Sequence, residues 1–352
     1  MLTTFLVAAT AFQGPFQPIN HIPLPPDRDD FTFVALGDNR PAGSGQPPTD
    51  VFKRILTEVA WIHPAFVLST GDLIYGNEES IEQYRKECAW IKPLVAGVGV
   101  PFFNAPGNHE INARAEFQSE YTKQFGAMYG SFDYGGCRFI GLATDQADST
   151  AKFTPAELSW LDTALADKKP AFIFQHRPYF ARKPDPSDAA TVDSAPAIAA
   201  KFAPANVKAV FEGHDHVFNH TTHGGVEYYI AGGAGAPLDA APEEGGFFHY
   251  LLVHVRNGKV EDITVMPLGS IDVRQNGSDI RVSSYVDADV DLGNVVVTWP
   301  TQPTSVHAAY DKKGKMADTD AAIVAVEKGD GGFRVHLSLS LKKHRQTIVH
   351  LG

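Results

Sequence analysis

From Phe31 to about residue 214, short apolar runs alternate with segments of helical pattern. The apolar runs are FTFVALGD (31–38), AFVLSTGD (65–72), VPFFNAPGN (100–108), CRFIGLAT (137–144), AFIFQH (171–176) and VKAVFEGH (207–214). The helical segments between them span 49–62, 79–96, 112–125 and 154–167. Runs that are nearly continuous in apolar residues are typical of strands covered on both faces. The alternation therefore predicts an α/β core in which helices pack against a sheet.

The pattern changes after about residue 225, where strand-like segments follow one another without helices. GVEYYIAGGAGA and FFHYLLVHVRNGKV have the composition of strands, and Asn257-Gly258 favours a hairpin turn before KVEDITVMPL. Beyond Gly269 the strand-like segments are DIRVSSYV, NVVVTW, AAIVAVEKG and FRVHLSLSLKK. We therefore expect a lead-in at 1–30, a main domain at 31–268, and a small β-rich C-terminal domain or sheet extension at 269–352.

The first fifteen residues, MLTTFLVAATAFQGP, hold a short apolar run and an A-x-A match at Ala9-Thr10-Ala11. This pattern favours a signal segment, and with it a periplasmic or secreted protein, although no Lys or Arg precedes the run. A frayed N-terminal strand in a cytoplasmic protein is the alternative.

The charge and hydropathy of the chain limit the classes of molecule and surface that it is expected to bind. The chain has 30 Lys and Arg against 41 Asp and Glu, a net charge of -11 that would repel a nucleic-acid polymer. No run of eighteen apolar residues is present, so we expect no membrane span. The sequence leaves protein partners unknown, and it leaves open whether Cys88 and Cys137 pair.

Five short polar motifs stand where the expected strands end. They are Gly37-Asp38-Asn39-Arg40, Gly71-Asp72-Leu73-Ile74-Tyr75, Gly107-Asn108-His109-Glu110, His176-Arg177-Pro178 and Gly213-His214-Asp215-His216. Open α/β sheets bind ligands beyond the carboxyl ends of their strands, so the motifs should meet at one rim. Asp, Asn and His supply the oxygen and imidazole ligands that suit zinc, iron or manganese. A Gly-Asp pair after a strand is by itself more often a turn, but five motifs in this order predict a metal site.

The order and content of these motifs resemble the calcineurin-like metallophosphoesterases, whose motifs run D-x-H, GDxx(D/Y), GNH(E/D), xxxH and GHxH. The purple acid phosphatase-like branch is the most similar, because its second motif is GDxxY and its fourth is V-x-x-H. Here those positions hold GDLIY (71–75) and IFQH (173–176). The resemblance covers residue 31 to about residue 265. It implies a metallophosphoesterase sandwich of two mixed β-sheets flanked by helices, with the β-rich C-terminal region outside it.

The resemblance also implies a role for each motif residue. The first metal would be held by Asp38, Asp72, Tyr75 and His216, and the second by Asp72, Asn108, His176 and His214. Asp72 would bridge the two ions. The catalytic residue His109 would contact the phosphoryl oxygen or protonate the leaving alkoxide.

One departure from the family pattern concerns Arg40, which stands where many members place a metal-binding histidine. A guanidinium cannot ligate a cation, and Tyr75 is placed to supply the missing ligand. A phenolate forms readily only beside a strong Lewis acid, which favours Fe³⁺ with Zn²⁺, Mn²⁺ or Fe²⁺ as its partner. Two divalent ions, with Tyr75 as a rim aromatic, are the alternative. Arg40 is then expected to act on the substrate phosphate.

The expected function is hydrolysis of small phosphate monoesters by a hydroxide that the two metal ions activate. A phosphodiesterase acting on small nucleotide or lipid-type diesters is the runner-up within the same chemistry. A non-catalytic binding protein stabilised by metal is the alternative from another class. Arg40, Asn39 and Arg177 are the candidate substrate contacts.

Overall fold

The computed structural model describes residues 16–76, 80–182 and 191–352. Its helices are α1 (Asp50–Ile62), α2 (Ile81–Gly97), α3 (Asn108–Ile111), α4 (Ala115–Phe125), α5 (Pro155–Ala164) and α6 (Ala195–Ala199), with a 3₁₀ turn at Pro242–Glu244. The strands up to the end of the main region (residues 31–268) are β1 (Asp30–Leu36), β2 (Val67–Ser69), β3 (Phe102–Asn104), β4 (Gly130–Tyr134), β5 (Cys137–Gly141), β6 (Ala171–Phe174), β7 (Val207–Glu212), β8 (Phe218–His223), β9 (Val226–Ala231), β10 (His249–Arg256) and β11 (Lys259–Pro267). The predicted signal segment lies outside the described residues.

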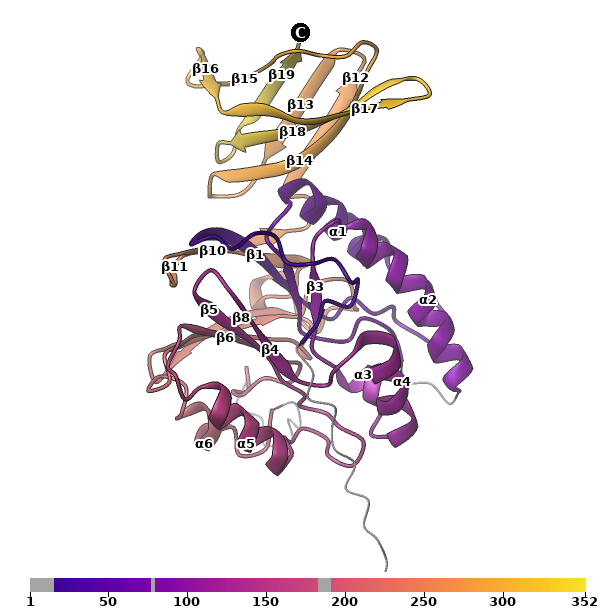
Figure 1. The fold of residues 1–352 in the computed structure, drawn as a ribbon, viewed down its shortest axis with the longest axis vertical. Helices are drawn as coiled ribbons and strands as arrows, with labels where there is room; N and C mark the ends of the chain where they lie inside the picture. The colour runs from indigo at the N-terminus through magenta and orange to yellow at the C-terminus, as the bar shows by residue number, and fades with distance from the viewer. Residues whose placement is uncertain (1–15, 77–79, 183–190) are drawn as a thin grey trace, which may run out of the picture.

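Two sheets build the main region (Figure 1). The first has the order β11-β10-β1-β2-β3 and the second the order β4-β5-β6-β7-β9-β8. β1, β2 and β3 run parallel, as do β5, β6, β7 and β9, whereas β10, β11, β4 and β8 pair antiparallel with their neighbours. Both sheets are therefore mixed, which confirms the expected metallophosphoesterase fold.

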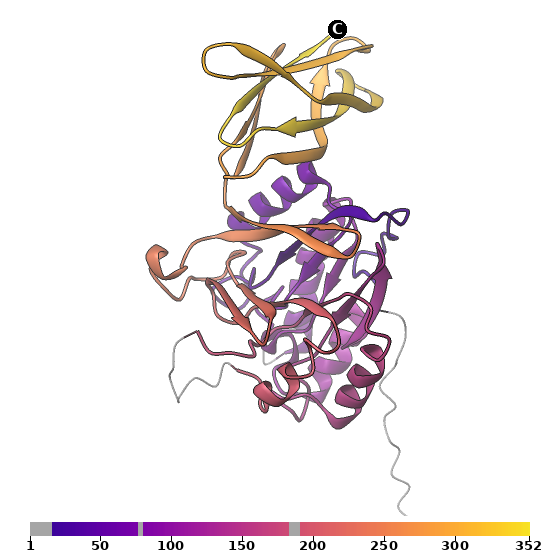
Figure 2. The ribbon, with the colours of Figure 1, turned by 90° about the vertical axis from the view of Figure 1, so that its left-hand side faces the viewer.

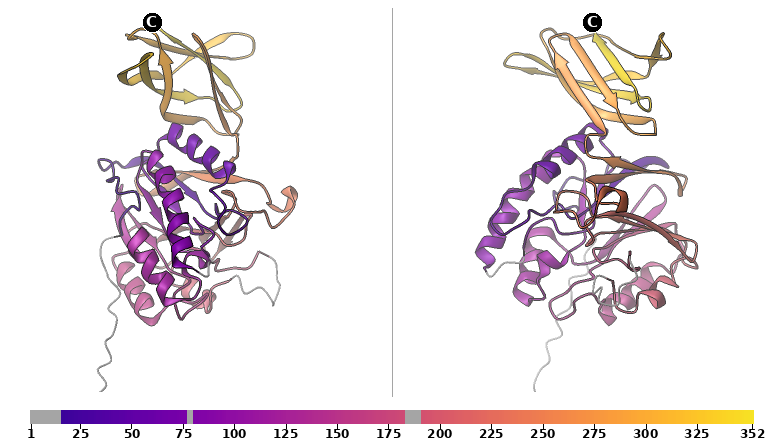
Figure 3. Two further views of the ribbon diagram at one scale, coloured as in Figure 1. Left: turned by 90° about the vertical axis from the view of Figure 1, so that its right-hand side faces the viewer. Right: turned by 180° about the vertical axis from the view of Figure 1, so that it is seen from behind.

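The alternation of side chains along β1 shows how the layers pack. Phe33 and Ala35 point into the core between the two sheets, whereas Val34 and Leu36 point into the core beneath the helices. The core between the sheets is rich in phenylalanine; the Phe33 ring, for example, lies 5.5 Å from the Phe172 ring of the opposite sheet. Helices α1, α2 and α4 cover the first sheet, and α5 and α6 cover the second (Figure 3). Strands covered on both faces explain why the apolar runs are nearly continuous.

Two helices differ in detail from the expected segments. The helix expected at 154–167 is α5, which Thr154 caps by accepting the Glu157 N–H; it ends at Ala164, and the Glu157 carboxylate accepts the Ala143 N–H at 2.8 Å. The helix predicted at 112–125 begins only at 115, because Asn112 and Ala113 both have positive φ. The residues before it form the separate turn α3, which carries the third polar motif.

The C-terminal region (residues 269–352) is entirely β-structure. Its strands are β12 (Ile271–Asn276), β13 (Asp279–Ser284), β14 (Val290–Trp299), β15 (Val306–Asp311), β16 (Met316–Thr319), β17 (Ala321–Gly329), β18 (Gly332–Leu341) and β19 (Gln346–Leu351). They form sheets of order β12-β13-β19-β15-β16 and β14-β18-β17, and lie at one end of the molecule against α1 (Figure 2). At this junction the buried Glu58 carboxylate accepts the Gly269 N–H at 2.9 Å. The β-rich character is confirmed, and the boundary at 268 stays a prediction.

The described part of the lead-in packs onto the main region. Phe16 is buried against Phe103 and Phe174, and the Ile19 N–H donates to the Phe102 carbonyl beside β3. Among the described residues, no helix is both long enough and apolar enough to cross a bilayer.

Candidate metal centre

The five polar motifs meet where the two sheets face each other at their strand ends. Asp38 follows β1, Asp72 follows β2, Asn108 opens α3 after β3, His176 follows β6, and His214 and His216 follow β7. Backbone bonds tie neighbouring loops together: the Asp38 N–H donates to the Gly71 carbonyl at 3.0 Å and the Gly213 N–H to the His176 carbonyl at 2.8 Å. The Asp38 carboxylate accepts the His214 N–H at 3.0 Å, which joins the first sheet to the second. The rim expected from strand-end placement is therefore present.

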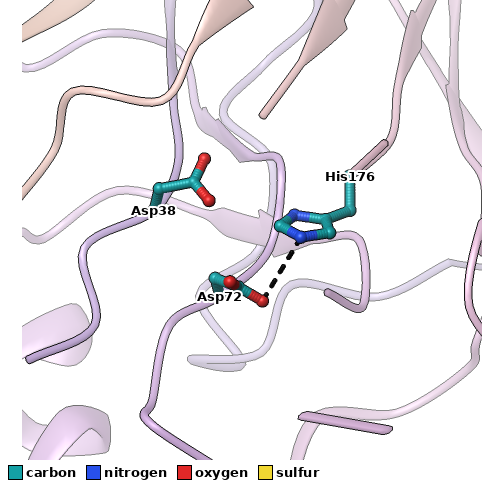
Figure 4. Close-up of side chains that lie close together, drawn as sticks. All are labelled: Asp38, Asp72 and His176. Carbon is teal, nitrogen blue, oxygen red and sulfur yellow. Dashed lines mark ion pairs between the residues drawn. The ribbon is translucent and has the colours of Figure 1, made fainter. Parts of the chain in front are cut away.

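Asp38, Asp72 and His176 form the centre of this rim (Figure 4). One ligand atom from each lies within 4.8 Å of the others, and all three side chains are buried. His176 Nε2 is 3.4 Å from Asp72 Oδ1, the pair marked by the dashed line. Two carboxylates and an imidazole at this separation are a donor set that suits a first-row transition metal.

A second set of ligand atoms, from Asn108, His176 and His214, adjoins the first and shares His176 with it. Asn108 Oδ1 lies 2.8 Å from His176 Nε2 and 2.9 Å from His214 Nδ1, and these two nitrogens are 3.1 Å apart. On the other side of the centre, His216 Nε2 is 3.7 Å from Asp38 Oδ1. The rings of the two histidines of the last motif therefore face different candidate ligands, His214 the Asn108 amide oxygen and His216 the Asp38 carboxylate.

The orientation of two imidazoles fits metal binding. His176 Nδ1 lies 3.0 Å from the Thr70 carbonyl and His216 Nδ1 lies 2.6 Å from the Pro237 carbonyl. A carbonyl can only accept, so each Nδ1 carries the proton and each Nε2 presents a lone pair. Those lone pairs face carboxylate and amide oxygens, which are also acceptors. Acceptors that converge without a proton between them are stabilised by a cation, so the residues fit a metal pair.

The pKa directions agree with this donor set. Burial, together with the neighbouring Asp72 charge, raises the pKa of Asp38 well above its usual value. Burial lowers the pKa of His176, and burial with the charges of His176 and Arg177 lowers the pKa of His214 to about 2. Neutral imidazoles are the form that binds metal, and a cation would relieve the repulsion between the two carboxylates.

The backbone at these positions is strained. Asp38, Asp72 and His214 have φ values of 58°, 54° and 72°, in the left-handed region that non-glycine residues rarely occupy. A Cβ atom at Gly107 would overlap Asp72 Oδ1, so only glycine permits this close approach. Backbone conformations of this kind cluster at functional sites, and here three candidate ligands share one.

Glu110 holds two of the ligand loops together. Its Oε2 accepts the N–H groups of Asp72 at 3.0 Å and Gly107 at 2.7 Å. Its Oε1 accepts the N–H groups of Leu73 at 2.6 Å and Ile74 at 3.2 Å. Burial and the Asp72 charge raise the pKa of Glu110 to about 8. Glu110 therefore fixes the backbone of the loops that carry Asp72 and Gly107.

His109, Tyr75 and Arg40 gather beside Asp72. The His109 N–H donates to Asp72 Oδ1 at 3.1 Å, its Nδ1 contacts the Tyr75 carbonyl, and its ring lies 5.3 Å from the Tyr75 ring. Arg40 Nε lies 3.5 Å from Asp72 Oδ2, so the guanidinium is partly engaged by a carboxylate. Asn39 is fully buried and donates to the Leu73 carbonyl at 2.9 Å. The catalytic, metal-binding and substrate-binding roles assigned to these residues stay predictions.

A known protein family and several known proteins match the part of the chain that carries this site. A family model described as calcineurin-like phosphoesterase matches residues 31–218, more than half of the chain. The chain belongs to the calcineurin-like phosphoesterase family. Human serine/threonine-protein phosphatase CPPED1 is 28% identical over 198 residues, and the Pongo abelii protein of that name is 30% identical over 198 residues. Each match covers 51% of this chain and 62% of the relative.

A solved structure supports the fold. The crystal structure of a dimetal phosphatase from Danio rerio superposes with a TM-score of 0.52 at 15% identity, covering 67% of this chain and 95% of that one. Membership of the calcineurin-like phosphoesterase family supports a hydrolase activity.

Sequence reasoning missed two residues of this phosphoesterase site. Asp239 Oδ2 accepts the His216 N–H at 2.8 Å, and Asp145 receives Arg177 Nε at 2.8 and 3.0 Å. Asp145 follows the strand β5, so its strand-end position is a signal that could have been used. Asp239 lies in an irregular segment with no pattern around it. Arg177 is 7% exposed, and its Nη1 lies against His214.

Proposed function

We propose that this calcineurin-like phosphoesterase hydrolyses phosphate monoesters at a pair of metal ions. The ions would be held by Asp38, Asp72, Tyr75 and His216 on one side and by Asp72, Asn108, His176 and His214 on the other. The observation that carries the proposal is the convergence of unprotonated acceptors: His176 Nε2 faces Asp72 Oδ1 at 3.4 Å and Asn108 Oδ1 at 2.8 Å.

The bound pair would supply Lewis acidity, lowering the pKa of a water molecule and stabilising charge on the phosphoryl oxygens. Asp72, placed between the two ligand sets, would be a ligand to both ions. His109 lies beside Asp72, with Nε2 4.0 Å from Asp72 Oδ2, and would give a proton to the departing alkoxide. Arg40, 3.5 Å from the same carboxylate oxygen, would place positive charge beside the phosphate.

The substrate class proposed is an alkyl phosphate monoester such as phosphoserine. The relatives named serine/threonine-protein phosphatases support this choice over a small diester, since such phosphatases act on alkyl monoesters. We propose Fe³⁺ with a divalent partner for the metals, because Tyr75 stands at the position of the phenolate ligand in the purple acid phosphatase-like branch. Two divalent ions are the alternative.

One sample of purified protein tests these points together. Metal content is measured by mass spectrometry, the visible spectrum is recorded, and turnover of p-nitrophenyl phosphate is compared with that of bis-p-nitrophenyl phosphate. Two metals per chain, one of them iron with a tyrosinate charge-transfer band, and faster monoester turnover are the expected results. Two divalent ions without the band would remove Tyr75 as a ligand to Fe³⁺, and faster diester turnover would favour the phosphodiesterase. Bound metal without turnover of either ester would favour the metal-stabilised binding protein, and absence of both metal and turnover after reconstitution would overturn the proposal.

A further inference from the structure

Two turns of the C-terminal region hold five of its six lysines. The turn between β15 and β16 has the sequence KKGK (312–315), and the turn between β18 and β19 has the sequence KKHR (342–345). β15 pairs with β19, with Tyr310 opposite Thr347, so the two turns lie at the same end of these strands. They line a common hollow of about 370 Å³. Its lining includes Lys313 and Met316 from the first turn and the start of β16, and His344 and Arg345 from the second turn.

Most basic side chains of the two turns have no acidic partner. Lys342 pairs with Asp289 and His344 pairs with Asp287, each at 2.8 Å. The other five are exposed and form no ion pair with any residue that the structure describes: Lys312, Lys313, Lys315, Lys343 and Arg345. We call these five residues the basic patch. They concentrate positive charge on a chain whose net charge is -11.

Hydrogen bonds fix the backbone of both turns. Asp311, the acidic residue next to the basic patch, accepts the Gly314 N–H at 2.6 Å and so holds the first turn. The Lys312 N–H donates to the Lys315 carbonyl at 2.7 Å. In the second turn, the Arg345 N–H donates to the carbonyl three residues before it, at 3.1 Å. The basic side chains therefore project from an ordered backbone, and a partner that binds them has no backbone to order.

An exposed apolar side chain stands beside these charges. Met316 follows Lys315 directly, is 57% exposed, and lines the hollow together with Lys313. In the part of the chain that the structure describes, the other large apolar side chains exposed to this extent are Tyr285 and Val324. Peripheral proteins bind anionic bilayers through lysines with an apolar side chain among them, because the charges attract the headgroups and the apolar group enters the acyl boundary.

We propose that the basic patch and Met316 dock the C-terminal region on the surface of an anionic lipid bilayer. The C-terminal region forms one end of the molecule, so a flat bilayer can contact this end and little of the acidic remainder (Figure 2). A nucleic-acid polymer is the less suitable partner, since it would extend along surfaces that carry the net charge of -11. Docking uses none of the candidate metal ligands, so this inference goes beyond the proposed function and does not depend on it.

The test is sedimentation of the full chain with lipid vesicles. Vesicles of phosphatidylcholine with about 30% phosphatidylserine are compared with vesicles of phosphatidylcholine alone, at about 0.1 M salt. We expect at least about tenfold stronger binding to the anionic vesicles. Raising the salt to about 0.5 M should remove most of that difference, because salt screens the attraction between exposed charges.

Two variants of the docking surface measure its contribution. The triple variant Lys312→Gln/Lys313→Gln/Lys315→Gln should weaken binding to anionic vesicles about a hundredfold, because each lysine near such a surface contributes about fivefold. Met316→Ser should weaken it about three- to tenfold through the loss of apolar contact. The replaced side chains are exposed, so both variants should keep the unfolding midpoint of the wild type.

A matched control removes the same charge from the other region. The triple variant Lys86→Gln/Lys123→Gln/Lys152→Gln replaces three exposed lysines of the main region and changes the net charge equally. It should change the affinity for anionic vesicles by less than about twofold.

The outcomes are distinct from those that test the proposed function. Equal binding of wild type to both kinds of vesicle, or binding to neither, would overturn the inference. Equal losses in the two lysine triple variants would do so as well, because binding would then follow the overall charge. Tighter binding to a duplex oligonucleotide than to anionic vesicles would assign the basic patch to nucleic acid instead. Turnover of p-nitrophenyl phosphate is measured separately and should be the same in wild type and in every variant.

Discussion

The main region buries several of its charged side chains, whereas the C-terminal region leaves its charged side chains at least partly exposed. In the main region, Asp38 and Asp72 follow the strands β1 and β2 and Glu212 ends β7, and all three residues are buried. In the C-terminal region, all of which the structure describes, every Asp, Glu, Lys, Arg and His is at least partly exposed. Its ion pairs, such as Lys342 with Asp289 at 2.8 Å, lie on the surface.

This difference distinguishes buried charged residues that serve catalysis, in the main region, from the buried residues of the C-terminal region, which serve folding. Burying a carboxylate costs free energy unless a partner compensates it, and exposed pairs contribute little to stability. The main region keeps Asp38 and Asp72 close together, and burial with the Asp72 charge raises the pKa of Asp38. That arrangement is stable with cations between the carboxylates, so we expect substitutions there to reduce activity and substitutions of buried residues in the C-terminal region to reduce only stability.

The largest effect is expected for Asp72→Asn. It removes the negative charge shared by both ligand sets, so kcat should fall about a thousandfold or more, since metal clamping contributes several kcal/mol to catalysis. Bound metal, measured by mass spectrometry, should fall below two per chain. Asp287→Asn, on the surface of the C-terminal region and paired with His344, is the matched control and should change neither quantity. Retention of more than about a tenth of wild-type kcat would argue against Asp72 as the bridging residue.

A smaller loss is expected for His109→Ala, and it should depend on the leaving group. General acid catalysis contributes about 10²-fold or more when the leaving group needs a proton. Turnover of an alkyl phosphate should therefore fall more than turnover of p-nitrophenyl phosphate, whose leaving group needs little assistance. His307→Ala removes an exposed histidine of the C-terminal region and serves as the control. Equal losses on both substrates would assign His109 to positioning rather than proton transfer.

A third substitution, Glu110→Gln, is compared with the same change at another buried carboxylate, Glu58. Both oxygens of Glu110 accept N–H groups of the ligand loops, and the amide nitrogen of glutamine cannot. We expect Mn²⁺ affinity to fall about 10- to 100-fold, as for other residues that orient ligands. Glu58→Gln is the matched control, because Glu58 is also buried on a helix and accepts backbone N–H groups, from Gly269 and Ile271. Its loss should reduce the free energy of unfolding and leave Mn²⁺ affinity intact; a similar loss of affinity in both variants would indicate a general effect of destabilisation.

The sequence predicts the parts of the main region that depend on local signals. Apolar runs such as AFIFQH identify strands covered on both faces, and the Gly-Asp and Gly-Asn pairs after them mark the loops that meet at the rim. The order of the five motifs then indicates the family. Each of these motifs and apolar runs occupies only a few consecutive residues of the chain.

Contacts between distant segments had no such signal. Asp239 reaches the His216 N–H from an irregular loop, and Asp145 fixes Arg177 across 32 residues. Arg177 was expected as a substrate contact, and its burial depends on how the loops after β5 and β6 pack. In the C-terminal region β15 and β19 were not singled out, because short polar strands depend on their neighbours more than on their own propensity.

The smallest effect on catalysis is expected for Leu337→Ala in the C-terminal region. Leu337 on β18 is fully buried, so its truncation should lower the free energy of unfolding by about 2–5 kcal/mol. Chemical denaturation measures that loss, and kcat per folded molecule should equal the wild-type value because the ligand loops lie in the other region. Val324→Thr, at an exposed position of β17, should change stability by less than about 0.5 kcal/mol. A fall in kcat for Leu337→Ala after correction for the folded fraction would mean that the C-terminal region supports the metal centre through α1, which β14 packs against.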